Sequence, residues 1–87
     1  NYAQYQMSKY LLKIGDIRGS EYYLNLSADN GCVFAIKDII KNMMDSGRYD
    51  DALIWVEKLK KLYPDTNTEL YIQKITQKKS NPNNNYI

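Results

Sequence analysis

The fold is decided by the stretch Gly47-Arg48-Tyr49-Asp50-Asp51-Ala52-Leu53, which joins two segments of helical periodicity. Before it, apolar residues recur at the three- and four-residue spacing of one helix face over about residues 33–46. After it, the same spacing continues until Pro64, which cannot extend a helix. Gly47 can adopt a positive φ at low cost, and Asp50 is a suitable N-cap residue. The stretch therefore predicts a helix–turn–helix hairpin that ends at about residue 64.

The same helix–turn–helix pattern occurs earlier in the chain, around Gly15. Superposing Gly15 on Gly47 gives an offset of 32 residues, at which small residues meet small ones and large apolar residues meet large apolar ones. The matched pairs include Ala3 with Ala35, Met7 with Ile39, Leu11 with Met43, Ser20 with Ala52, and Tyr23 with Trp55. A hairpin cannot bury its apolar face alone, and stacked repeats share such faces. We therefore predict two hairpins, at about residues 3–31 and 33–64, with Ala3 and Ala35 in equivalent environments.

The chain after Pro64 predicts one more helix and a tail. Thr66 precedes Glu69 by three residues, which is the spacing of a capping box at a helix start. A weaker apolar stripe follows, so we expect a capping helix over about residues 66–79 and a single helical domain over residues 1–79. The polar, asparagine-rich residues 80–87 have little to bury and are expected to be disordered.

The second hairpin resembles the tetratricopeptide repeat family. Gly47 matches the turn of that motif, Tyr49 the aromatic residue at the start of its second helix, Ala52 its small contact residue and Pro64 its terminal proline. The first hairpin departs from the motif, because serine replaces the alanine and no proline closes the hairpin. It is closer to the related Sel-like repeats, whose pattern of small, aromatic and glycine positions is matched by Ala3, Tyr5, Tyr10, Gly15, Tyr23, Ala28, Gly31 and Ala35.

The resemblance covers about residues 3–64 and implies an all-α fold. Antiparallel helix–turn–helix repeats would stack as a short right-handed solenoid of about five helices. An irregular helical bundle without such stacking is the structural alternative. The resemblance also implies a concave surface, formed mainly by the first helix of each hairpin, on which a protein or peptide would bind.

The family's groove positions give this chain a set of candidate partner-binding residues. These residues are Tyr2, Tyr5, Lys9, Leu12, Lys13, Phe34, Lys37, Lys41, Asp45 and Gln73. Lys9, Lys37 and Lys41 would make the groove locally basic, which suits an extended acidic segment or a terminal carboxylate. The carboxylate clamp of the family is incomplete here, since Gln73 and Glu69 stand where further polar and basic residues are needed. Tyr5 and Phe34 could instead serve only to pack between helices.

Composition narrows the function classes. The chain has 87 residues and a formal net charge of +2, which is too mild to predict a nucleic-acid-binding protein. No apolar run approaches the roughly 18 residues that span a membrane. Histidine is absent and Cys32 is the single cysteine, so neither an intramolecular disulfide nor a zinc cluster can form. We expect Cys32, which stands in an apolar stretch, to be a small buried hydrophobic residue.

Motifs that could carry chemistry have simpler interpretations. Asp50 and Asp51 could form an acid–base pair, but they stand at a predicted helix start, where solvated negative charge is favourable. Lys58, Lys60 and Lys61 could contact phosphate, but they stand at a helix end, which favours basic side chains. No glycine-rich phosphate loop is present. We therefore expect no catalytic residue, no metal site and no cofactor.

Three functions follow as hypotheses. The first is a non-catalytic adaptor that binds a peptide or protein, with an acidic segment as one candidate partner. The second is an inhibitor, such as a bacterial immunity protein, that neutralises a toxin by tight binding. The third is a structural segment of a longer solenoid, and self-association through the repeat ends is compatible with any of them. The sequence begins with Asn1 and shows no signal peptide. We therefore expect a processed chain or an excised piece, and we favour a cytoplasmic location.

Overall fold

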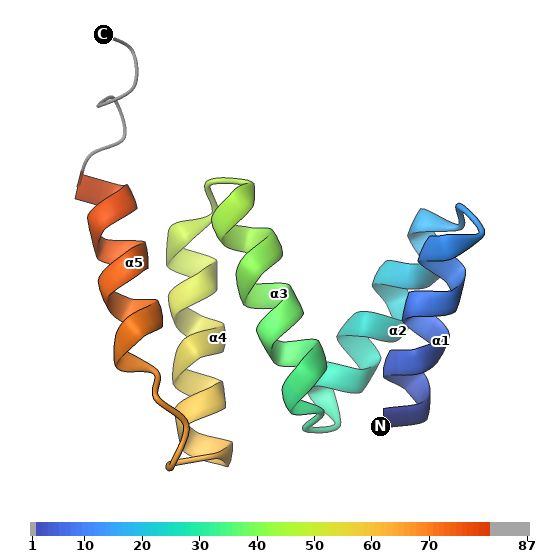
Figure 1. The fold of residues 1–87 in the computed structure, drawn as a ribbon, viewed down its shortest axis with the longest axis horizontal. Coiled ribbons are helices and arrows are strands. Elements are labelled where there is room, and N and C mark those ends of the chain that lie inside the picture. Colours follow the sequence, from blue (N-terminus) through green and yellow to red (C-terminus); the bar gives the residue numbers. More distant parts are fainter. Residues whose placement is uncertain (1, 81–87) are drawn as a thin grey trace, which may run out of the picture. The chain divides into compact units, whose positions relative to one another are not determined.

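The computed structural model describes residues 2–80, which form five α-helices and no β-strand (Figure 1). The helices are α1 (Tyr2–Lys13), α2 (Ile17–Asp29), α3 (Val33–Asp45), α4 (Tyr49–Leu62) and α5 (Glu69–Ser80). The prediction of an all-α chain with about five helices is confirmed. Except for Ser80, which ends α5, the predicted disordered tail of residues 80–87 lies outside the described residues. The chain divides into two units, residues 1–39 and 40–87, with the boundary inside α3.

The 32-residue period appears in the local structure of the turns. Helices α1 and α3 end at residues 13 and 45, and helices α2 and α4 begin at residues 17 and 49. Gly15 and Gly47 have φ values of 88° and 77°. At both turns, the glycine N–H donates to the carbonyl three residues earlier at 3.1 Å, and the next N–H donates to the carbonyl five residues earlier at 2.8 Å. Each glycine therefore ends its α-helix in the same way, with a backbone conformation of positive φ. This shared requirement explains why the two glycines align in the sequence.

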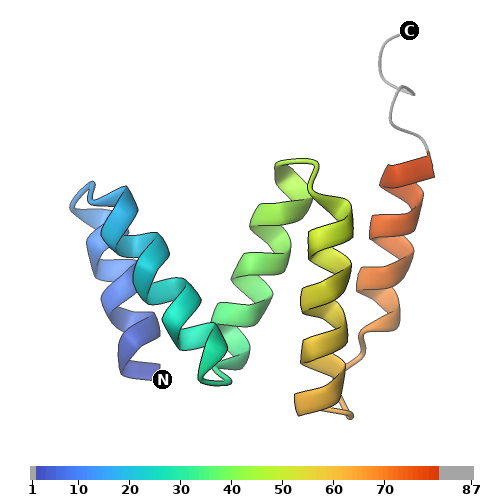
Figure 2. The same cartoon turned by 180° about the vertical axis from the view of Figure 1, so that it is seen from behind.

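In the first unit, α1 and α2 lie side by side and run in opposite directions (Figures 1 and 2). Two buried serines stand between them: the Ser8 Oγ donates to the Ser20 carbonyl at 2.8 Å and lies 3.2 Å from the Ser20 hydroxyl. Small side chains allow this close approach, and the hydrogen bond satisfies the buried hydroxyl of Ser8. The apolar core of this unit consists of Ala28, Cys32, Ala35, Ile36 and Ile39. The prediction that Cys32 is a buried apolar residue is thus confirmed.

In the second unit, α4 packs against α5. The buried apolar side chains of this unit come from all three of its helical segments, and they are Ile40, Ala52, Val56, Leu59 and Ile75. An exposed ion pair between the Lys79 ammonium and the Asp50 carboxylate joins the end of α5 to the start of α4. Because both side chains are solvated, burial of the apolar residues is the main source of stability in this unit.

Two predicted helix caps are wrong. Asp50 does not cap α4, since the N-cap position belongs to Arg48 and carries no side-chain cap; Asp50 lies in the first turn. The side chain that does cap a helix is that of Asp16, which accepts from the Gly19 N–H at 3.0 Å at the start of α2. Helix α5 begins at Glu69 and not at Thr66, because the Thr66 N–H donates to the Tyr63 carbonyl in a turn.

The predicted equivalence of Ala3 and Ala35 is also wrong. Ala35 and Ile39 are buried in α3, whereas their counterparts Ala3 and Met7 are exposed on α1. Within residues 2–80, no other element covers this face of α1. The period therefore holds for the turns and for the pair Ser20 and Ala52, both of which are buried, but fails on one face of α1.

Candidate functional site

Three aromatic rings from α1 and α3 form a cluster on the first unit. The ring centroids of Tyr2, Tyr5 and Phe34 lie 5.8–6.1 Å apart in tilted and stacked arrangements. Tyr2 and Phe34 are about half exposed, at 50% and 53%, although aromatic rings are costly to leave in water. Tyr5 is partly buried. The cluster is thus a preassembled apolar surface that solvent and other molecules can reach.

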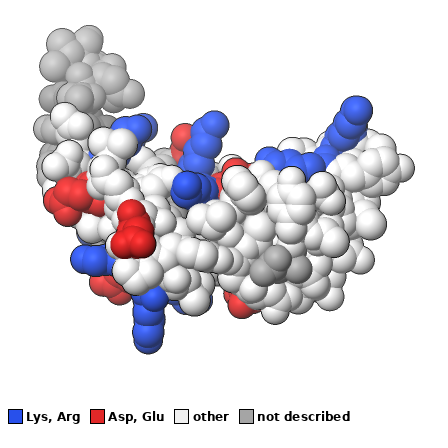
Figure 3. All heavy atoms as spheres, turned by 60° about the horizontal axis from the view of Figure 1, so that its bottom comes forward, with Lys and Arg blue, Asp and Glu red and all other residues white. Residues whose placement is uncertain are grey.

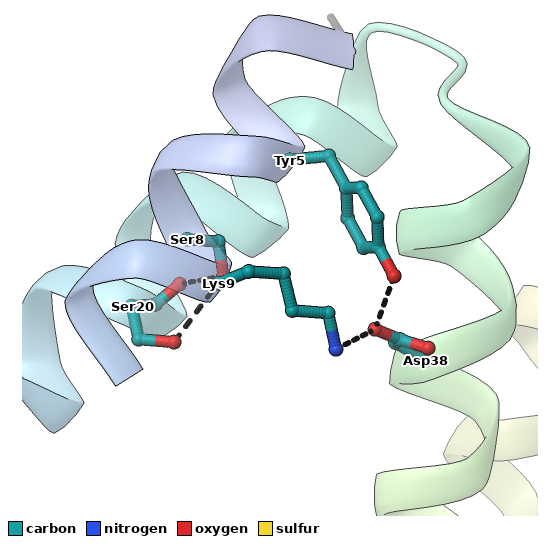
Figure 4. A network of polar contacts seen from close by, with 5 residues as sticks. All are labelled: Tyr5, Ser8, Lys9, Ser20 and Asp38. Atoms are coloured by element: carbon teal, nitrogen blue, oxygen red, sulfur yellow. Dashed lines mark hydrogen bonds and ion pairs between the residues drawn. The ribbon is translucent and has the colours of Figure 1, made fainter. Parts of the chain in front are cut away.

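A polar network fixes one side of this cluster (Figure 4). The Tyr5 hydroxyl donates to Asp38 Oδ2 at 3.0 Å, and the Lys9 ammonium lies 2.7 Å from the same oxygen. Lys9 also stands 5.3 Å from the centroid of the Tyr5 ring, within reach of a cation–π interaction. One carboxylate of α3 therefore holds two side chains of α1. We refer to Tyr2, Tyr5, Phe34, Lys9 and Asp38 together as the aromatic site.

Two pKa values in the aromatic site are raised. The pKa of Lys9 is raised chiefly by its hydrogen bond to Asp38, which stabilises the ammonium form. The pKa of Tyr5 is raised first by burial and then by the hydrogen bond to Asp38, both of which disfavour the phenolate. In both cases the folded chain holds its proton more tightly than the unfolded chain. The contribution of these two groups to the free energy of unfolding is therefore complete below about pH 10, near their pKa values in the unfolded chain. It is lost as the pH rises through the raised values.

We expect Asp38→Asn to lower the pKa of both Lys9 and Tyr5 toward their usual values, because an amide neither attracts the ammonium nor accepts as strongly from the hydroxyl. NMR titration of the Lys9 side chain and the Tyr5 ring measures both shifts. Asp29→Asn, at an exposed acid of α2, is the control and should leave both titrations unchanged. Equal pKa values in wild type and Asp38→Asn would contradict the network.

The structure brings together four of the sequence-predicted site residues: Tyr2, Tyr5, Lys9 and Phe34. Leu12 and Lys13 are exposed one helical turn beyond Lys9, and Lys37 is exposed one turn beyond Phe34. The remaining predicted residues lie in the second unit, all exposed, and they are Lys41, Asp45 and Gln73.

Asp38 is the functional residue that sequence reasoning missed. It follows Phe34 by four residues, so it lies on the same face of α3, and this spacing is the signal that could have found it. Its ion pair offsets the charge of Lys9, which was expected to contribute to a basic groove. Lys13 and Lys37, in contrast, form no ion pair with any residue of the range 2–80. Of the three lysines in the first unit, Lys13 and Lys37 therefore keep a charge that no ion pair of the described chain offsets.

Other kinds of site find little support among the described residues. Residues 2–80 contain no group of three or more acidic, cysteine or histidine side chains that could hold a metal ion. None of the five helices is long and apolar enough to cross a bilayer. On the face drawn in Figure 3, the part formed by the first unit carries few charged side chains. The exposed rings of Tyr2 and Phe34 are an apolar feature that this unit presents to solvent.

Comparison with known proteins adds nothing to this geometry. No protein-family model matches the chain, and no curated protein or solved structure matches it either.

Proposed function

We propose that this chain is a non-catalytic protein-interaction module, and that the aromatic site is where it binds a peptide or a peptide-like segment of a protein partner. The observation that carries the proposal is the exposure of Tyr2 and Phe34 beside the ordered Tyr5. Exposed aromatic side chains that cluster together are typical anchors of protein interfaces.

The polar network supports binding by holding the site in one conformation. Tyr5 is fixed through its hydroxyl to Asp38, and Phe34 stacks on the Tyr5 ring with an interplanar angle of 25°. Side chains that are already ordered lose less conformational entropy when a partner binds. A partner residue that stacks on Phe34 therefore meets a surface that does not have to rearrange.

The charges beside the site indicate the chemistry of the partner. Lys13 and Lys37 are exposed and form no ion pair within the described chain. They can therefore pair with acidic side chains of a partner without breaking an existing contact. An apolar or aromatic anchor residue next to one or two acidic residues is the peptide that best fits this surface.

Selection from a displayed random-peptide library on the immobilised full chain tests the proposal. We expect enriched peptides that combine an apolar anchor with acidic residues. Replacing an interface anchor by alanine costs about 2 kcal/mol or more. Phe34→Ala should therefore weaken the peptides roughly 30-fold, as measured by fluorescence anisotropy. The matched control is Ile54→Ala, because Ile54 has the same exposed fraction of 53% but lies on α4. Failure to enrich any peptide, or equal binding by Phe34→Ala and wild type, would refute the site.

A charge variant separates the two parts of the site. The double variant Lys13→Glu, Lys37→Glu should abolish the preference for acidic residues and reverse the salt dependence of binding, since repulsion replaces attraction. These positions are better probes than Lys9, because Lys9→Glu would also break the contact with Asp38.

A further inference from the structure

One apolar face of α1 remains uncovered, on a different side of the helix from the aromatic site. Ala3, Met7, Tyr10 and Ile14 recur at spacings of four, three and four residues, so they form one stripe along the helix. All four are exposed, and the exposed fraction of both Tyr10 and Ile14 is 58%. The Ile14 N–H donates to the Tyr10 carbonyl, which continues the helical pattern one residue past Lys13. We call these four residues the α1 stripe.

The repeat indicates what kind of element fits this stripe. At the 32-residue offset, Ala3 and Met7 correspond to Ala35 and Ile39, which are buried in the core of the first unit. The same positions on α3 are thus used for helix packing within the chain. A small residue followed one turn later by a large apolar residue allows another helix to approach closely and then fills the space beside it. The α1 stripe therefore has the composition of a helix-packing face.

We propose that the α1 stripe is a self-association surface, on which the α1 helix of a second copy of this chain packs in the antiparallel direction. The pattern of the stripe is self-complementary in that arrangement. Ala3 of each copy lies opposite Ile14 of the other, and Met7 lies opposite Tyr10. Each small residue thus meets a large one, as in an interdigitated interface.

The charges are compatible with two copies of α1 side by side. Helix α1 contains no acidic residue, and its two cations are Lys9 and Lys13. Lys9 points to the other side of the helix, where Asp38 pairs with it. In the antiparallel register Lys13 lies opposite Gln4 of the second copy. The two Lys13 side chains are then about 13 Å apart along the axis at 1.5 Å per residue. This separation exceeds the Debye length of about 8 Å in physiological salt, so their repulsion is screened.

The size of the stripe sets the expected affinity. From Ala3 to Ile14 it is about 17 Å long, and one helix face of this length buries less than the roughly 800 Å² per partner of a standard interface. We therefore expect a weak dimer, largely associated at about 1 mM and largely dissociated at about 10 μM. Sedimentation velocity over this concentration range measures the association.

Tyr10→Glu tests the stripe, because a charge at its centre must be desolvated in the dimer. We expect this variant to remain monomeric at about 1 mM, which is a shift in Kd of more than tenfold. Ile54→Glu, at a similarly exposed position of α4, is the matched control and should dimerise like the wild type. Circular dichroism confirms that both variants remain helical. A wild-type chain that stays monomeric at about 1 mM, or a dimer that survives Tyr10→Glu, would overturn the proposal.

Disulfide trapping tests the register independently. The native Cys32 is buried, so it contributes little background. Chains carrying Met7→Cys and chains carrying Tyr10→Cys are mixed and oxidised. Antiparallel packing predicts that the mixed disulfide forms faster than either homodimeric disulfide, whereas parallel packing predicts the reverse. Phe34→Ala should leave all of these results unchanged. Failure of self-association and failure of peptide binding are therefore distinguishable.

Discussion

Leu59→Ala is expected to destabilise the chain by about 2–5 kcal/mol, the largest single effect that we predict. Leu59 is fully buried on α4, on the face that also carries the buried Val56 and Ala52. Truncation removes three carbon atoms and leaves a cavity that the surrounding helices can fill only in part. A chain of this size has a total stability of roughly 4–12 kcal/mol, so this loss is a large fraction of it and should clearly lower the urea midpoint.

Urea denaturation followed by Trp55 fluorescence measures this effect. The single tryptophan lies one turn before Leu59 on the same helix, so it reports on the second unit directly. Leu62→Ala is a control of identical chemistry on the same helix, since the exposed fraction of Leu62 is 53%. We expect the control to lose less than about 1 kcal/mol. Similar losses for the two leucine variants would show that the buried face of α4 has been assigned incorrectly.

Features determined by local sequence could be predicted. Gly15 and Gly47 close helices with a positive φ, and this requirement is visible in the residue type itself. The apolar spacing likewise gave the number of helices and the burial of Cys32. Each of these features depends on a few neighbouring residues, so no knowledge of distant contacts was needed.

The residues that cap the helices were predicted less well, because several neighbouring residues have the type of an N-cap. Asp50 has the residue type of an N-cap, but the left-handed turn at Gly47 places the cap position at Arg48. Thr66 has capping-box spacing to Glu69, but its N–H is held in a turn by the Tyr63 carbonyl. The geometry of the preceding turn decided both cases, and residue type alone does not encode it.

The aromatic site was predicted in part. The family resemblance selected Tyr2, Tyr5, Lys9 and Phe34, and these residues do lie together. It did not select Asp38, because the contact from Asp38 to Tyr5 spans 33 positions of sequence. Such a contact depends on how α1 and α3 pack, which a pattern within one helix cannot specify. The pairing of Lys9 with Asp38, which offsets the charge of Lys9, was missed for the same reason, since the two residues are remote in sequence.

The second large effect is expected at Ala52, where the repeat itself supplies the control. Ala52 is fully buried at the start of α4, and its counterpart on α2 is the buried Ser20. Ala52→Leu adds three carbon atoms to a side chain that its neighbours enclose completely, so α4 must shift away from them. We expect a loss of about 3 kcal/mol, at the upper end of the range for overpacked cores. Urea denaturation monitored through Trp55 measures this loss.

Ala52→Ser is the matched control, because serine already occupies the equivalent position of the first hairpin. In that hairpin, the Ser20 hydroxyl lies 3.2 Å from the hydroxyl of Ser8, whose counterpart at the 32-residue offset is the apolar Ile40. A serine introduced at position 52 therefore has to turn its hydroxyl back to the Arg48 carbonyl, one turn earlier in the helix. This hydrogen bond is available at little cost, so the control should lose less than about 1 kcal/mol. If Ala52→Leu were as stable as Ala52→Ser, position 52 would not require a small residue. The shared constraint that aligns the two hairpins would then be absent.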